Sequence, residues 1–118
     1  MPIDLLIQSK RFPEPDHTLI TVCASWPDYR NFWHPGIRDL GLSNLMDLLE
    51  INQVNLDMLN KRSVVEELQL LRDWITRQPA FSDGSCQGDL DRLVTRISTA
   101  TELITIYVDE ACEFAAIL

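Results

Sequence analysis

The chain has 118 residues, of which 46% are hydrophobic, and its formal net charge is −8 with a sequence pI of about 4.5. This length and apolar content predict one globular domain over residues 1–118 and exclude a disordered chain. The acidic balance and the scattered basic residues argue against nucleic-acid binding, which needs clustered Lys and Arg side chains.

No apolar run approaches the ~18 residues that a membrane span needs. The first residues include Asp4 where a signal peptide would have basic residues. We therefore expect a cytoplasmic protein that does not enter a membrane. The three cysteines, Cys23, Cys86 and Cys112, form no C-x-x-C pair. We interpret them as reduced structural residues and expect no metal site and no cofactor.

Two β-compatible segments open the chain, at residues 3–8 and 18–26. They predict an antiparallel hairpin joined by a loop at 13–16, which needs a helical layer over one face to be stable. Along the second segment the apolar residues alternate with more polar ones. The more apolar set is Ile20, Val22, Ala24 and Trp26, and the other set is Leu19, Thr21 and Cys23. We expect the helices to pack on the more apolar set.

Residues 25–35 carry four of the nine aromatic residues of the chain. Ser25 can cap a short helix that has Pro27 in its first turn and that Pro35 would end. Such a helix would place three rings on one side with a fourth adjacent: Trp26, Tyr29 and Trp33, with Phe32 beside them. Two interpretations remain open. The rings form a small core at the end of the strand pair, or they form a binding surface that includes Arg30, because Trp, Tyr and Arg dominate interface hot spots.

Three further segments have helical spacing. A helix is expected from Ser43, although residues 51–59 fit a helix or a strand, and a connector at 36–41 precedes it. The clearest helix runs over 63–79. Ser63 and Glu66 form a capping box, Pro79 ends the helix, and one apolar stripe consists of Val64, Leu68, Leu71 and Ile75. A long final helix is expected from Asp89 to about Ala115, with residues 103–108 open to a strand.

Taken together, these segments predict an α+β fold in which a short N-terminal antiparallel β-hairpin packs on a three-helix bundle.

The segment Gly84-Ser-Cys-Gln-Gly has the outline of a nucleophile elbow, and His34 lies about fifty residues upstream of Cys86, as in one cysteine-protease pattern. No strand precedes the segment, and the chain is too short for the large sheet that such enzymes need. We interpret both matches as coincidence and expect no catalytic residue. Neither His17 nor His34 has the neighbours of a metal ligand set.

These observations favour a non-catalytic protein–protein interaction module, such as an immunity- or antitoxin-type inhibitor or an adaptor, for a partner protein with a basic surface. After Arg96 every charge is negative. The expected partner-binding residues are Trp26, Tyr29, Arg30, Phe32, Trp33, Glu102, Asp109 and Glu113.

Two alternatives remain open. The chain could be a small ligand-binding protein or enzyme with a pocket lined by Trp26, Trp33 and His34. Its apolar stripes could also serve a homodimer.

Overall fold

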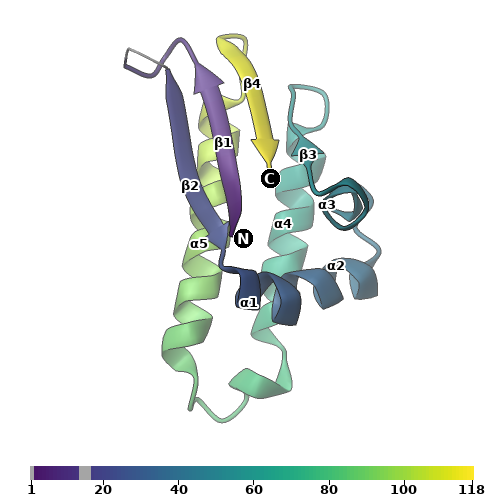
Figure 1. Ribbon diagram of the computed structural model, residues 1–118. Coiled ribbons are helices and arrows are strands. Elements are labelled where there is room, and N and C mark those ends of the chain that lie inside the picture. Colours follow the sequence, from purple (N-terminus) through teal and green to yellow (C-terminus); the bar gives the residue numbers. More distant parts are fainter. Residues whose placement is uncertain (1, 14–16) are drawn as a thin grey trace.

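A computed structural model describes residues 2–13 and 17–118 of the chain, so part of the loop expected at 13–16 lies outside the described residues. The predicted α+β fold is confirmed (Figure 1). Its sheet has four antiparallel strands in the order β2-β1-β4-β3. The strands are β1 (Ile3–Ser9), β2 (Thr18–Ala24), β3 (Val54–Asn55) and β4 (Cys112–Ile117).

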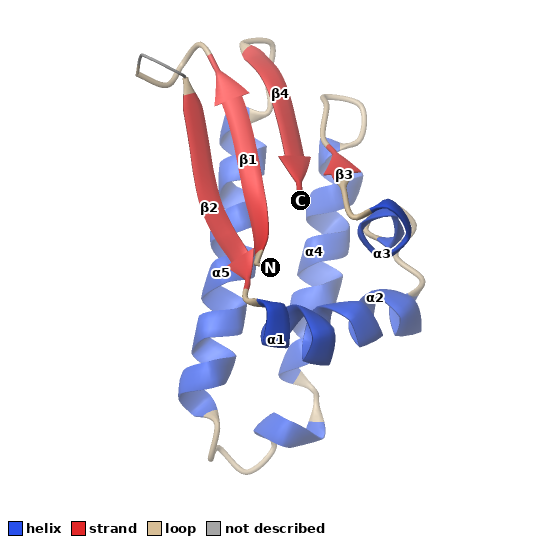
Figure 2. Ribbon diagram, in the orientation of Figure 1, coloured by secondary structure: helices blue, strands red, loops and turns tan. Residues whose placement is uncertain are grey.

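The helices form two groups, and there are more of them than the three expected. The two long helices are α4 (Lys61–Thr76) and α5 (Gln87–Tyr107), which pack on one another. The short ones are α1 (Trp26–Asp28), a π-helical turn η1 (Tyr29–Trp33), α2 (His34–Leu40), α3 (Met46–Ile51) and a 3₁₀ turn η2 (Pro79–Phe81). Within the described residues, α4 and α5 lie behind one face of the sheet and no helix lies in front of the other (Figure 2).

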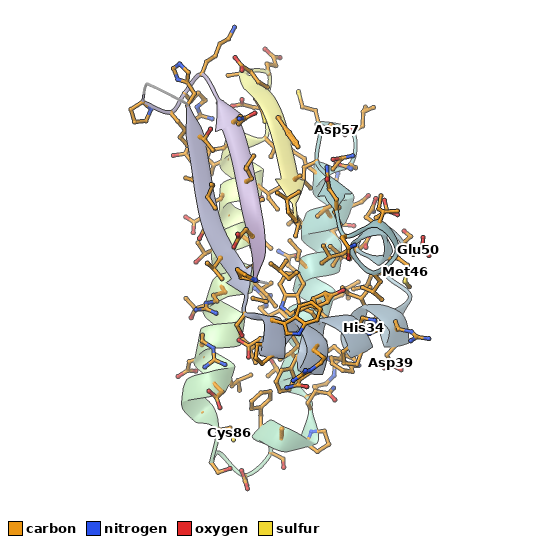
Figure 3. The ribbon with its side chains drawn as sticks, viewed as in Figure 1. His34, Asp39, Met46, Glu50, Asp57 and Cys86 are labelled. Carbon is orange, nitrogen blue, oxygen red and sulfur yellow. The ribbon has the colours of Figure 1, made fainter. Side chains whose placement is uncertain are left out.

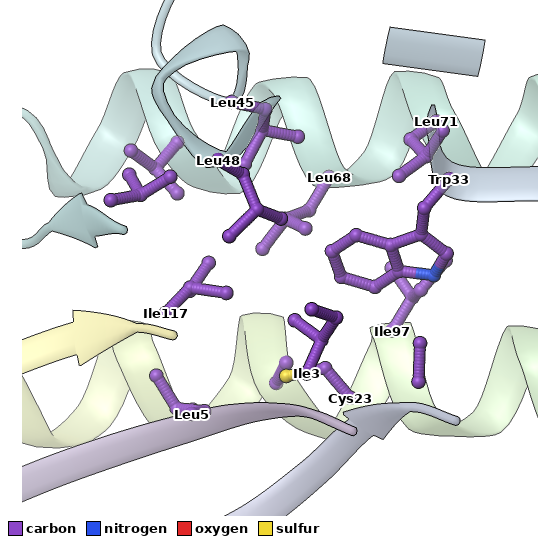
Figure 4. Packing of buried hydrophobic residues seen from close by; sticks show 14 of the residues in the cluster. Ile3, Leu5, Cys23, Trp33, Leu45, Leu48, Leu68, Leu71, Ile97 and Ile117 are labelled. Carbon is purple, nitrogen blue, oxygen red and sulfur yellow. The ribbon is translucent and has the colours of Figure 1, made fainter. Parts of the chain in front are cut away.

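The core lies between the sheet and the two long helices. Leu5 and Ile7 of β1 are fully buried. The predicted stripe of the helix over 63–79 is confirmed, because all four of its residues are fully buried. Trp33 also lies in this core, and Figure 4 shows its indole ring between Leu71 and Ile97. The short helices therefore close the end of the core nearest the N-terminus.

The expected start of the long central helix is wrong. The helix begins at Lys61, with Asn60 as its N-terminal flanking residue, so Ser63 lies inside the first turn and forms no capping box. The turn that precedes α4 is stabilised by the side chain of Asp57 instead. Asp57 accepts the backbone N–H groups of Leu59 and Asn60, at 2.8 and 2.9 Å, and thereby fixes the entry of the chain into α4.

The two segments that fit either a helix or a strand now have assignments. Residues 54–55 form the short strand β3, and residues 103–107 belong to helix α5. The expectation that the last helix continues to about Ala115 is wrong, because residues 112–117 form β4 between β1 and β3. The last strand therefore enters the sheet next to the first.

The expected orientation of β2 is wrong for residues 19–23, and of the set expected to face the helices within this strand only Ala24 is buried. Leu19 and Thr21 pair with Ile7 and Leu5, and therefore share the helix-facing side of the sheet. Ile20 and Val22 point to the other side, where they are 62% and 41% exposed. A bulge at Cys23 then shifts the alternation, because Ile3 pairs with Ala24 while Asp4 pairs with Val22. As a result both Cys23 and Ala24 are buried.

Candidate functional site

The sheet presents an apolar surface on the side away from α4 and α5. We call it the outer face and define it by the register of the strands. It consists of Asp4, Leu6 and Gln8 of β1, Thr18, Ile20 and Val22 of β2, Asn55 of β3, Phe114 and Ala116 of β4, and Leu118. Ala116 is fully buried within this face. Leu118 joins the face because its backbone exchanges two hydrogen bonds with that of Asp4, at 2.8 and 2.9 Å. A sheet face with this many apolar side chains normally packs on another layer.

Asp4 is the one charged residue among the residues that define the outer face. Its Oδ1 atom is buried and has no hydrogen-bond partner among the described residues. The carboxylate also acts on its surroundings, since burial and the charge of Asp4 together raise the pKa of the Cys23 thiol to about 12. A carboxylate oxygen that is shielded from water without a donor is costly, so Asp4 is a site where a donor would stabilise the fold.

A pocket of about 790 Å³ opens at the end of the outer face where the two chain termini lie. Its walls come from the start of β1, the short helices and the last residue. They are Pro2, Ile3, Asp4, Trp26, Tyr29, His34, Leu48, Leu49, Asn52 and Leu118. Asp4 and Leu118 belong both to the pocket and to the outer face, so the two surfaces are continuous.

Three rings line one side of this pocket. The indole of Trp26 is 47% exposed and stacks on Tyr29, with the ring centres 5.4 Å apart. Tyr29 meets the imidazole of His34 edge-on at 6.0 Å. His34 begins α2 and lies below Met46 and Glu50 of α3 (Figure 3). Burial raises the pKa of the Tyr29 phenol, so the ring stays neutral near neutral pH.

A widened helical turn places these rings. Pro35 has no backbone N–H and would clash with a carbonyl one α-turn back. The helix was expected to end at Pro35, but it does not. The chain instead passes through a π turn in which the N–H of His34 donates to the carbonyl of Tyr29. It then continues as α2 through the expected connector to a left-handed cap at Gly41. An extra residue in the turn rotates the side chains that follow it.

The four aromatic residues divide between the core and the surface. Tyr29 and Trp33 belong to the core and Phe32 packs against it, as the first of the two interpretations has it, while Trp26 is half exposed. Trp26 and Tyr29 stay at the pocket, whereas Trp33 is fully buried in the core. Phe32 stacks on Phe81 of η2, with ring centres 5.2 Å apart. Of the three residues expected to line a pocket, Trp26 and His34 line this one and Trp33 does not.

Two buried carboxylates hold the pocket walls in place. The Ser25 side chain caps α1 as predicted, accepting the N–H of Asp28 at 3.3 Å, and Asp28 in turn accepts two hydrogen bonds from Arg92 of α5, at 2.9 and 3.1 Å. Glu67 of α4 accepts the backbone N–H groups of Asn44 and Leu45, each at 3.0 Å, just before α3. The sequence pattern did not single out either carboxylate, because each partner lies more than twenty residues away.

The acidic residues expected to steer a partner do not form one helical face. Glu102 is exposed on α5, whereas Glu113 is exposed on β4. Asp109 is occupied by Arg11, at 2.6 Å. Burial alone would raise the pKa of Asp109, but the N–H of Ala111 and the guanidinium of Arg11 hold it below its usual range.

Arg30 is exposed on the π turn. Cys86 lies at the far tip of the molecule, well away from His34 (Figure 3). In the described part of the chain, no three His, Cys, Asp or Glu side chains lie together as a metal would require, and no helix is long and apolar enough to span a membrane.

No protein-family model, curated protein or solved structure matches this chain.

Proposed function

We propose that this chain is a non-catalytic protein-binding module, and that its outer face is the docking surface for a partner protein with a basic surface. The observation that carries the proposal is the exposure of Ile20 and Val22 beside Leu6, Phe114 and Leu118, on a sheet face that no helix covers among the described residues. Apolar surface gains roughly 25 cal/mol for each Å² removed from water, and contiguous exposed patches of this kind typically mark interaction sites.

The charge of the molecule supports a basic partner. The chain carries eight more negative than positive charges, and Asp4 is the one charged residue of the outer face. A Lys or Arg side chain of the partner would therefore meet an opposite charge next to the apolar side chains of the outer face. An inhibitor or an adaptor would use such a surface in the same way.

The experiment uses capture of the tagged protein from its native lysate, followed by calorimetry with the purified partner. The test variant is the double replacement Ile20→Thr and Val22→Thr, which keeps β-branched residues in β2. The matched control is Ile106→Thr, because Ile106 is 43% exposed but lies on α5. We expect a basic partner whose affinity falls at least roughly tenfold with the double variant and stays unchanged with the control.

Three results would overturn the proposal. The first is a capture that retains no basic protein, and the second is a double variant that binds the partner as the native chain does. The third is a native chain that sediments as a dimer which the double variant loses. The last result would show that a second copy covers the outer face.

A further inference from the structure

We infer that the pocket beside Asp4 is a binding site for an organic cation, namely a primary ammonium or guanidinium group on an apolar stem. The inference goes beyond protein docking on the outer face, because it concerns the chemistry of the pocket and can be tested with small molecules alone.

The size and lining of the pocket suit a ligand with an apolar body. Its volume of about 790 Å³ lies within the range of small-molecule sites, roughly 300–1,000 Å³. Most of its walls are apolar, and they come from Pro2, Ile3, Trp26, Leu48, Leu49 and Leu118. Such walls hold an alkyl or aryl stem and provide few hydrogen bonds. The specificity must therefore come from the few polar groups that share the pocket.

The polar groups select the charge of the ligand. Asp4 is the single acidic residue of the lining, and the other polar residues there are Tyr29, His34 and Asn52. An anionic ligand would be repelled by Asp4, and a neutral apolar ligand would leave its Oδ1 atom without a donor. A cationic head supplies both the charge and the N–H donors, and hydrogen bonds between charged groups are about twice as strong as neutral ones.

The aromatic side of the pocket favours the same choice. Trp26 is half exposed and stacks on Tyr29, so the lining presents an electron-rich indole close to the entrance. Cations are attracted to the faces of aromatic rings, most strongly to Trp, by roughly 0.5–2 kcal/mol. A carboxylate and an indole in one largely apolar pocket act together on an ammonium or guanidinium group. The net charge of −8 further raises the local concentration of cations.

The test is a titration of the native chain followed by NMR of the backbone amides and the indole N–H groups. The probes are n-butylammonium and n-butylguanidinium, with n-butanol and butyrate as neutral and anionic analogues of similar size. We expect the two cations to shift the signals of Asp4 and Trp26 and to bind at least roughly tenfold more tightly than butanol. Equal affinity for butanol and butylammonium would overturn the inference.

Two variants and a control sharpen the test. Asp4→Asn should lower the affinity for butylammonium roughly tenfold and leave that for butanol unchanged. Trp26→Leu, at a half-exposed position, should weaken cation binding by roughly twofold to tenfold. The control is Glu110→Gln, which removes a negative charge at an exposed position outside this pocket. An Asp4→Asn variant that binds butylammonium like the native chain, with an unchanged fold by its amide spectrum, would overturn the inference.

A competition separates the two sources of such a cation. If the captured partner displaces butylammonium, the cation is a Lys or Arg side chain of that partner. If both bind at once, the cation is a free amine. The double variant at Ile20 and Val22 should lose the partner and keep butylammonium, so a failure of the docking proposal can be told apart from a failure of the cation site.

Discussion

Single residues decide whether the pocket walls keep their places, and Glu67 is the clearest case. It is 8% exposed and accepts the N–H groups of Asn44 and Leu45 that precede α3. Both N–H groups donate to Oε1, while Oε2 accepts the backbone N–H of Asn44 at 3.2 Å and its side-chain amide. Glu67→Gln puts an NH2 group in the place of one of these oxygens, so a donor then faces the donors that this oxygen accepted. We expect the free energy of unfolding to fall by about 2–3 kcal/mol, measured by urea denaturation.

The neighbouring residue provides the control for Glu67. Glu66 is exposed and forms an ion pair with Arg62 at the surface, so Glu66→Gln should change the stability by less than about 0.5 kcal/mol. Equal losses for the two variants would contradict the role of Glu67. Because α3 carries Leu48 and Leu49 of the pocket, the Glu67 variant should also weaken the binding of butylammonium.

Cys23 makes the stability depend on pH in the alkaline range. Burial, with a smaller contribution from the charge of Asp4, raises the pKa of its thiol from 9.0 to about 12. The folded state therefore holds this proton more tightly than the unfolded state. The resulting contribution to stability is intact below pH 9 and is lost as the pH rises through 9 toward 12, by at most about 1.4 kcal/mol per pH unit.

Urea denaturation of the native chain and of Cys23→Ala at several pH values between 8 and 10.5 tests this effect. Other groups titrate equally in both proteins, so the difference between their stabilities isolates the thiol. The native chain should be the more stable one below pH 9, and its advantage should shrink above that value. Parallel stability curves would show that the thiol does not titrate differently in the two states.

At the scale of elements, the close approach of α2 to α4 depends on Gly36. A Cβ atom built there would lie 2.6 Å from Cδ1 of Leu71 and 2.8 Å from the ring of Trp74. Gly36→Ala should therefore force the two helices apart and lower the free energy of unfolding by about 1–3 kcal/mol, measured by urea denaturation.

Gly88 of α5 is the matched control, because an added Cβ atom meets nothing within 4 Å there. Gly88→Ala should stabilise the chain by about 0.4–1 kcal/mol, since alanine reduces the conformational freedom of the unfolded state. A loss of stability at Gly88 as large as that at Gly36 would contradict the steric explanation.

The elements also show which parts of the fold local sequence patterns can predict. The stripe of α4 was predictable, because four apolar residues at helical spacing must face one partner surface. The hairpin was predictable from two β-compatible segments. The face of β2 that the helices cover was not predictable, because alternation identifies two faces and does not say which one is covered. The strand at 112–117 was missed because its apolar residues also fit a helical period.

The site was predictable only in part for a similar reason. The aromatic segment pointed to Trp26 and His34, which do line the pocket. Trp33 was misplaced because a regular helix was assumed through residues 25–35, and the π turn before Pro35 changes the phase. Asp4 was not singled out as a site residue. Asp4 lies beside Leu118 in the pocket only because the first and the last strand of the chain pair with one another. A local sequence pattern does not show this contact.

At the scale of the whole molecule, the net charge and the outer face should affect different steps of partner binding. The excess of eight negative charges acts over roughly 10 Å at 0.1 M salt and steers a basic partner before contact. The apolar side chains act only after contact. Replacing exposed charges should therefore change the association rate, whereas replacing outer-face residues should change the dissociation rate.

The double variant Glu102→Gln and Glu113→Gln tests this separation, because both side chains are exposed on elements other than β2. Asp109 is left intact, since it forms an ion pair with Arg11. We expect the association rate constant to fall about twofold to tenfold at low salt, with a weaker salt dependence and an unchanged dissociation rate. Stopped-flow kinetics at several salt concentrations measures both. The double variant at Ile20 and Val22 should show the opposite pattern, and a common change in the dissociation rate would contradict the division between steering and contact.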